Sequence, residues 1–206
     1  MHEGNNSEYL FFAGSSHPEL AKEVAESLGI SLGNISLNRF PDGEISLQVL
    51  DNVRGRDVFV LQTIALDPNN YLIELLIFVD ALKRAAARSI NVVIPYYGYC
   101  RQDRKDKPRV SIGAKLVANL LTVAGADRII TVDLHTDQIQ GFFDGPVDHM
   151  HAQGQLAEYV REQYGTDNIC VVSPDSGRVR VAEKWADSLN GAPLAFIHKT
   201  DRKSVV

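Results

Sequence analysis

The feature that most constrains the fold is a regular alternation of short apolar runs with longer segments of helical period. The apolar runs are rich in β-branched and aromatic residues, and the segments between them repeat apolar residues every three or four positions. Strands separated in this way by helices form a mostly parallel sheet that is covered on both faces. We therefore expect an α/β, doubly wound fold. The expected strands are EYLFFAG, NISLNRF, ISLQVL, DVFVLQT, NVVIPYY, DRIITVDL, NICVVSP and APLAFIHK.

Helix-end signals place the expected helices between these runs. In SSHPELAKEVAESLG, Ser16 or His17 is the expected N-cap, Pro18 suits the first turn and Gly29 ends the helix. A second helix is expected over residues 70–87. Its apolar face contains Leu72, Leu75, Leu76, Val79 and Leu82. The remaining expected helices are GAKLVANLLTVAG, AQGQLAEYVREQYG and GRVRVAEKWADSLNG.

The segment FFDGPVDHMHAQG, residues 142–154, interrupts the pattern and indicates a domain boundary. We expect an N-terminal domain over residues 1–148 and a partial second domain of the same type over residues 149–206. Only about two strands and two helices are expected in the second part, whereas a covered parallel sheet usually needs ~100 residues. An unfinished sheet of this kind is expected to aggregate or to need a partner.

Composition excludes several classes of function. The net charge is −5, and we see no basic helix with interleaved aromatic residues, so nucleic-acid binding is not expected. No apolar run is long enough to cross a bilayer, and the N-terminus lacks the pattern of a signal peptide. Two cysteines, Cys100 and Cys170, do not make a disulfide framework. A reducing, cytoplasmic location is the simplest expectation.

A dense run of charge follows the apolar strand that ends near Tyr97. Its anions are Asp103 and Asp106, and its cations are Arg101, Arg104, Lys105, Lys107 and Arg109. A solvated loop is one interpretation. The other is a phosphate site, because ligands of open α/β sheets bind at the carboxyl ends of strands and guanidinium groups match phosphate oxygens.

A turn sequence, RFPDGEISLQV, supplies a second candidate. Pro-Asp-Gly is ordinary hairpin chemistry. In the functional interpretation, Asp42 and Glu44 accept hydrogen bonds from an amino group and Phe40 offers a stacking face.

The segment TVDLHTDQIQGFFD places Asp133, His135 and Asp144 at or beyond the end of a strand. A structural role for the histidine is one interpretation. In an extended segment, however, Asp133 and His135 would share one face. Mg²⁺ prefers carboxylate, water and phosphate oxygens, so His135 is expected to contact phosphate or to play a minor part in the metal shell.

Two further candidates lie near the end of the sequence. In VVSPDSGRVRV, Asp175 is either a simple N-cap or part of an anion site at a helix N-terminus. In FIHKTDRK, Lys199 closes an expected strand and is either a surface lysine or a functional one.

Together these segments resemble the ribose-phosphate diphosphokinases. FPDGE, GYCRQDRK, AKLVANLL, TVDLHTDQIQGFFDGPVD and SPDSGRV occur in the order and spacing of that family, and SPDSGRVRVAEKWADSL and LAFIHK look closest to actinobacterial members. The resemblance implies two phosphoribosyltransferase-like domains in each subunit. It also implies transfer of the diphosphoryl group of ATP to the C1 hydroxyl of ribose 5-phosphate, giving 5-phosphoribosyl 1-diphosphate and AMP.

The resemblance implies roles for residues of the ATP site. Phe40, Asp42, Gly43 and Glu44 would hold the adenine from a neighbouring subunit. Residues Arg101, Gln102 and Asp103 would line the ATP site, with the arginine on phosphate. The implied assembly is a homo-oligomer, with dimers that form a hexamer.

The resemblance also implies which residues bind the metal and which residue acts in the transfer step. His135 and Asp175 match positions for Mg²⁺, Asp175 matches a substrate position as well, and Asp133 is a weaker metal candidate. Lys199 matches the catalytic lysine that steadies the transferring group. Arg54 and Gln138 fall in regions that resemble phosphate-responsive regulatory contacts.

The sequence departs from the family pattern in three places. Arg178 replaces a second glycine, Ser111 replaces a common proline, and the glycine-rich loop that cradles the ribose phosphate is missing. We therefore expect either a fragment of an active enzyme or a truncated chain without activity of its own. The alternative function is a non-catalytic, nucleotide-binding regulatory subunit. A base-salvage phosphoribosyltransferase shares the fold, but FPDGE and CRQDRK argue against it.

Overall fold

A computed structural model describes residues 9–197. Its contacts divide the chain into two compact units, Met1–Met150 and His151–Val206. The division falls two residues after the boundary expected from the sequence, 148 against 150. The assignment of these units as separate domains stays a prediction.

The first unit is built on a five-stranded sheet in the order β1-β4-β5-β6-β7, and every neighbouring pair is parallel. This arrangement confirms the expected α/β fold. Its strands are β1 (Tyr9–Ala13), β4 (Asp57–Leu61), β5 (Ser89–Ile94), β6 (Arg128–Val132) and β7 (Val147–Met150). All five point the same way, so the segments that follow them gather at one edge.

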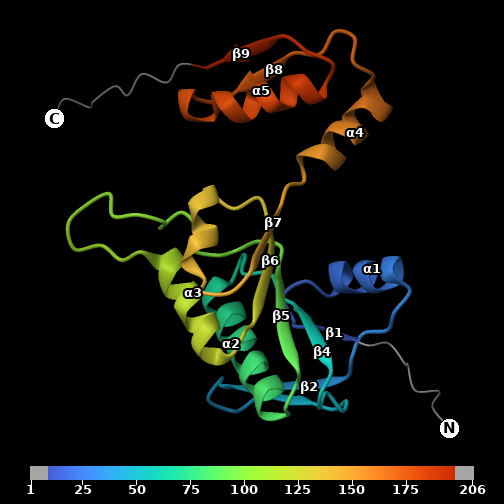
Figure 1. Ribbon diagram of the computed structural model, residues 1–206, viewed down its shortest axis with the longest axis vertical. Helices are drawn as coiled ribbons and strands as arrows, with labels where there is room; N and C mark the ends of the chain where they lie inside the picture. Colours follow the sequence, from blue (N-terminus) through green and yellow to red (C-terminus); the bar gives the residue numbers. More distant parts are fainter. Residues whose placement is uncertain (1–8, 198–206) are drawn as a thin grey trace. The chain divides into compact units, whose positions relative to one another are not determined.

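Helices cover the two faces of this sheet (Figure 1). Helices α2 (Pro68–Arg84) and α3 (Gly113–Ala124) share a large buried cluster with one face. Helix α1 (Pro18–Leu28) packs through Ala21 and Ala25 against Phe11 and Leu61 on the other face. The doubly wound arrangement is therefore confirmed.

The ends of α1 follow the capping signals of the sequence. The His17 ring nitrogen Nδ1 accepts a hydrogen bond from the Leu20 amide at 3.1 Å, and Gly29 ends the helix at a left-handed φ of 65°. Helix α2 starts at Pro68 and ends at Arg84, so the expected range of 70–87 was too late at both ends.

Strands β2 (Ile35–Arg39) and β3 (Ile45–Val49) form a separate antiparallel hairpin that packs against α2. Their identity as strands was expected, but their separation from the main sheet was not. The connection of five residues explains the antiparallel pairing, since a parallel pair needs a crossover of about a dozen residues or more.

Strand β7 was not expected from the sequence, where this segment indicated only a domain boundary. It contains Asp148 and His149, so its alternation of apolar and polar residues is short and weak. A short helical segment of 3₁₀ type, η1 (Asp137–Phe142), connects β6 to this strand.

The second unit contains α4 (Gln153–Tyr164), β8 (Val171–Ser173), η2 (Ser176–Arg178), α5 (Val179–Ser188) and β9 (Leu194–Phe196). Strands β8 and β9 form a two-stranded parallel sheet. Ala157, Leu189 and Ala192 make its small buried cluster. Val172 and Phe196 remain 53% and 61% exposed, so much of this sheet is uncovered.

Two expectations from composition can be compared with the described residues. None of the helices in residues 9–197 is both long and apolar enough to cross a membrane. Cys100 is buried, Cys170 is exposed, and neither forms a disulfide.

Candidate nucleotide and metal site

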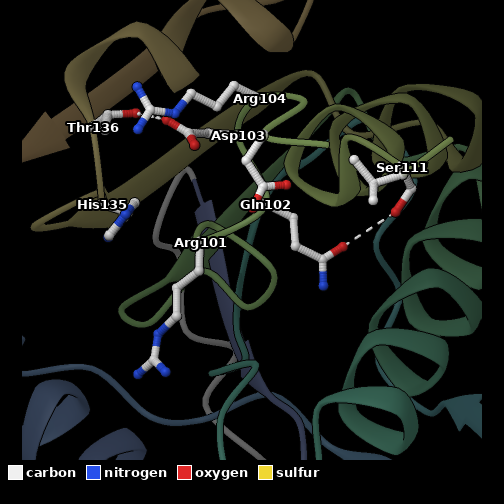
Figure 2. A pocket seen from close by; sticks show the side chains of 9 residues that line it. Arg101, Gln102, Asp103, Arg104, Ser111, His135 and Thr136 are labelled. Atoms are coloured by element: carbon white, nitrogen blue, oxygen red, sulfur yellow. Dashed lines mark hydrogen bonds between the residues drawn. The ribbon is translucent and has the colours of Figure 1, made fainter. Parts of the chain in front are cut away.

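A pocket of about 610 Å³ lies at the carboxyl edge of the five-stranded sheet. Two segments form it: the charged loop, residues 101–112, which connects β5 to α3, and the His135 loop, residues 133–136, which follows β6. The lining residues are Arg101, Gln102, Asp103, Arg104, Asp106, Val110, Ser111, His135 and Thr136 (Figure 2). The sequence expectation that charge gathers beyond β5 and β6 is therefore met by a concave site.

The pocket wall is predominantly polar and carries two guanidinium groups. Arg101 and Arg104 are both exposed and both line it. Guanidinium groups bind phosphate oxygens through paired N–H donors, so this wall suits a polyanion. His135 is exposed in the same pocket and comes from a different strand end.

Gln102 is held against the start of α3. Its backbone carbonyl accepts a hydrogen bond from the Ala114 amide at 3.2 Å, and its Oε1 accepts one from the Ser111 hydroxyl at 3.3 Å. A Cβ added at Gly113 would lie 2.5 Å from the same Oε1 atom, so a larger residue there would displace the Gln102 side chain. The first turn of α3 therefore fixes one end of the charged loop.

The His135 loop is fixed by hydrogen bonds to its successive amides. The Asp133 amide donates to the Met150 carbonyl at 2.9 Å, and the Leu134 amide donates to His149 Nε2 at 2.9 Å. Leu134 is buried, while Asp133 and His135 on either side of it are exposed. The loop therefore presents two polar side chains to solvent from a backbone that strand β7 holds in place.

The expected extended conformation of this loop is wrong. Strand β6 ends at Val132, and Asp133 has a φ of 46°, in the left-handed region. The alternation argument does not apply there, and of the two residues only His135 belongs to the pocket lining. Asp144, the third residue of that segment, lies 3.9 Å from Lys115 Nζ.

Cys100 directly precedes the charged loop and has a backbone hydrogen bond from His135 in the other loop. Its side chain is buried, and burial raises the pKa of the thiol to about 11, against an opposing effect of a backbone hydrogen bond from His135. The thiol is therefore protonated near neutral pH and is no candidate nucleophile.

The turn of the β2–β3 hairpin, residues 40–44, contributes nothing to the described lining of this pocket. It is shaped by its own hydrogen bonds: Arg39 donates to the Gly43 carbonyl at 2.9 Å, and the Glu44 amide donates to Asp42 Oδ1 at 3.2 Å. Gly43 has a φ of 93°, which favours glycine, and Phe40 is 53% exposed. The turn thus displays its side chains to solvent.

Two other expected site residues cannot be placed against the pocket. Asp175 belongs to the second unit, where its Oδ1 accepts a hydrogen bond from the Arg178 amide at 3.1 Å, as an N-cap does. Lys199 lies outside the described residues. Of the two suggested regulatory residues, Gln138 donates to Asp103, and the Arg54 amide donates to Asn52 Oδ1 at 3.2 Å.

Sequence patterns do not single out Thr136, and they give Arg104 and Asp106 no individual role. The two charged residues were visible as part of a run, but a run does not show which members face a ligand. A single threonine after His135 carries no signal in a sequence. Its importance follows from the fold, which brings its hydroxyl to the charged loop.

The donors fit a hard cation that takes most of its ligands from elsewhere. His135 and Asp133 offer an imidazole nitrogen and a carboxylate from one short loop, and both are exposed. Mg²⁺ keeps several waters and is usually held by one or two protein groups together with substrate phosphates. A divalent cation of this kind would take only a minority of its ligands from these two side chains.

Comparisons with known proteins identify the family of this chain. A family model described as the N-terminal domain of ribose phosphate pyrophosphokinase matches residues 9–125. The chain belongs to the ribose-phosphate pyrophosphokinase family. The ribose-phosphate pyrophosphokinases of Mycobacterium tuberculosis and Corynebacterium glutamicum are 56% and 53% identical to it over 196 residues, or 95% of this chain.

Members of the ribose-phosphate pyrophosphokinase family are transferases, and solved structures include a close match. The crystal structure of phosphoribosylpyrophosphate synthetase from Mycobacterium smegmatis has 56% sequence identity and a TM-score of 0.90. The match covers 94% of this chain and 65% of that one. The chain spans about 60% of the length of the curated relatives.

Proposed function

We propose that this chain takes part in the transfer of the diphosphoryl group of ATP to the C1 hydroxyl of ribose 5-phosphate, giving 5-phosphoribosyl 1-diphosphate and AMP. The observation that carries the proposal is the pocket in which Arg101 and His135 meet at the carboxyl edge of the sheet. Membership in the ribose-phosphate pyrophosphokinase family supports the reaction.

In this proposal the charged loop binds the nucleotide. Arg101 binds the phosphates of ATP and Gln102 lines the same site. Phosphoryl-type transfer asks a protein mainly to position the reactants and to neutralise charge. The guanidinium wall of the pocket supplies both, and no protein nucleophile is needed.

Magnesium would be held by His135, with Asp133 and Asp175 as further ligands, and it would neutralise charge on the transferring group. Asp175 would also contact the ribose substrate. Lys199 would steady the transferring diphosphoryl group. The cap hydrogen bond of Asp175 uses one carboxylate oxygen and is compatible with a second contact.

The hairpin turn supports a homo-oligomer. Phe40, Asp42, Gly43 and Glu44 do not line the pocket of their own unit, yet their side chains suit adenine recognition. We propose that this turn completes the site of a second copy, within dimers that assemble into a hexamer.

The first test is calorimetric titration of ATP with Mg²⁺. Arg101→Ala is expected to weaken binding about tenfold or more, because a hydrogen bond to a charged group is worth roughly 1.5–3 kcal/mol. Arg84→Ala removes an arginine at the end of α2, away from the pocket lining, and is the matched control. Equal losses for the two variants would reject the proposed ATP site.

The second test separates transfer from nucleotide binding alone. Release of AMP from ATP that depends on ribose 5-phosphate would support the transfer reaction, and Lys199→Ala should then lower kcat with little change in KM. ATP binding without any release of AMP would instead favour a regulatory role for this chain.

A further inference from the structure

The charged loop contains two aspartates in similar local sequence, and the fold treats them differently. Asp103 stands in QDRK and Asp106 in KDKP. Asp103 is only 8% exposed, whereas every other residue of the run 101–109 is exposed. A buried carboxylate needs hydrogen-bond donors, because removing its charge from water is costly.

Both donors to Asp103 come from the segment that begins with the His135 loop. The Thr136 hydroxyl donates to Asp103 Oδ2 at 2.8 Å, and Gln138 Nε2 donates to the same oxygen at 3.2 Å. Figure 2 shows the bond from Thr136 as a dashed line across the two segments. Through one oxygen atom, Asp103 therefore connects parts of the chain that are 33 and 35 residues apart in sequence.

We propose that Asp103 is a positioning residue, which anchors the charged loop to the His135 loop and so fixes Arg101 and Gln102 in the pocket. It acts through these neighbours and does not bind the nucleotide itself. A carboxylate in direct contact with triphosphate would repel it, and Oδ2 of Asp103 already accepts two hydrogen bonds. The effect on ATP rests on the proposed function, whereas the anchor does not.

An anchor matters here because the charged loop has no regular structure of its own. Residues 101–112 contain no helix or strand. Gln102 is fixed to α3 through Ser111 and Ala114, so Asp103 supplies the attachment to the other wall. Without it, the guanidinium groups could move by an ångström or more, a displacement that can cost about a hundredfold in rate elsewhere.

The first experiment tests the anchor without any nucleotide. Thr136→Val removes the hydroxyl donor, while Thr136→Ser keeps it. Both changes lie far in sequence from Arg101 and Arg104, so the peptide that trypsin cleaves in the charged loop is unaltered. Thr136→Val should raise the initial rate of cleavage in this loop several-fold, and Thr136→Ser should not. Equal cleavage of both variants and the natural chain would overturn the anchor.

The second experiment changes Asp103 itself. Because both hydrogen bonds end on one oxygen, Asp103→Asn can keep them through its amide carbonyl, and Asp103→Ala cannot. Asp103→Ala should weaken binding of ATP with Mg²⁺ by roughly tenfold. Asp103→Asn should resemble the natural chain in this measurement. Asp106→Asn removes the exposed carboxylate of the same loop and should not weaken ATP binding, because it takes an anion away from the phosphate site.

The outcomes separate three explanations. If Asp103→Asn weakens ATP binding as strongly as Asp103→Ala, the charge acts directly on metal or nucleotide and the positioning role is wrong. If Asp106→Asn weakens ATP binding as much as Asp103→Ala, the effect belongs to loop charge and the positioning role is wrong. If the natural chain binds no ATP, the proposed function fails, while tryptic cleavage of the Thr136 variants still decides the anchor.

Discussion

The two units of this chain use the same kind of strand in very different settings. In the first, the central strands β4 and β5 each have a parallel partner on both sides, and helices lie on both faces of the sheet. In the second, β8 and β9 have only each other among the described strands. Val60 and Val92 are fully buried in the first unit, while Val172 is 53% exposed in the second.

The difference shows that an apolar strand does not by itself make a core. Parallel sheets depend on cover for both faces, because their strands are apolar on both sides. The first unit meets this need within residues 9–150, whereas the second has a core of a few small residues around Leu189. Stability is therefore expected to concentrate in the first unit. Three measurements can test that contrast, and a fourth tests a surface ion pair within the first unit.

The largest effect is expected from the core of the first unit. Phe78 is 1% exposed and meets Phe12 edge to face, with ring centroids 5.8 Å apart. Phe78→Ala should lower the free energy of unfolding by about 3–5 kcal/mol, measured by urea titration of far-ultraviolet circular dichroism. Phe196→Ser, on the exposed sheet of the second unit, is the control and should change it by less than about 0.5 kcal/mol. Similar losses in both variants would remove the contrast.

Hydrogen exchange should reveal the same contrast strand by strand. Amides of β4 and β5 are expected to exchange on the order of a thousandfold more slowly than those of β8 and β9, because uncovered strands open locally at little cost. Mass spectrometry of exchanged peptides would measure both sets in one sample. Comparable protection in the four strands would show that the second sheet is better covered than its exposed side chains suggest.

The alkylation rates of the two cysteines, one in each unit, test the same contrast. Burial raises the pKa of Cys100 to about 11 and shields its sulfur, whereas Cys170 is exposed. Iodoacetamide at pH 8 should therefore modify Cys170 at least about a hundredfold faster than Cys100, since the thiolate is the reactive form. Peptide mapping after short exposure would give both rates. Equal rates would indicate that the first unit opens easily near its pocket.

The smallest effect is expected from an ion pair at the edge of the first unit. Asp57 accepts hydrogen bonds from Arg88 and from Ser89, and these, with the guanidinium charge, lower its pKa to about 2. Since the pKa in the unfolded chain is about 3.9, the stabilisation is present above pH ~4 and is lost as the pH falls through about 2. Because this pair is partly exposed, Asp57→Asn should cost only about 0.2–1 kcal/mol at pH 7.

The pH dependence of that cost is the check. Urea titrations at pH 7 and at pH 2 should show a difference between Asp57→Asn and the natural chain only at the higher pH. Glu26→Gln, which removes a partner of the more exposed Lys22–Glu26 pair, should show no difference at either pH. A cost for Asp57→Asn that persists at pH 2 would place its origin in packing instead of charge.

Much of the fold was predictable because its signals are local. Pro18 and Gly29 bracket α1 as their backbone preferences require, and continuous apolar runs such as VFVL and NVVI became buried parallel strands. Strand β7 was not predictable in the same way, because His149 and Asp148 weaken its pattern. It is held in place by pairing with β6, which is a tertiary effect.

The sequence predicted where the site lies but not how its residues are arranged. Charge after β5 and polar residues after β6 had to meet, because parallel strands end at one edge. The left-handed backbone at Asp133 was not visible, and neither was the difference between Asp103 and Asp106. That difference depends on the Thr136 hydroxyl, which reaches Asp103 from 33 residues away.

The hairpin turn at residues 40–44 has a thermodynamic consequence for any molecule that it meets. Its backbone is already held by the bonds from Arg39 and to Asp42, so docking it would freeze few additional torsions. A flexible segment with the same side chains would lose more backbone entropy on association, at about 1–2 kcal/mol for each residue whose backbone becomes fixed. The preformed backbone of this hairpin turn would therefore tighten association, although the hydrogen bonds that hold it lie within its own chain.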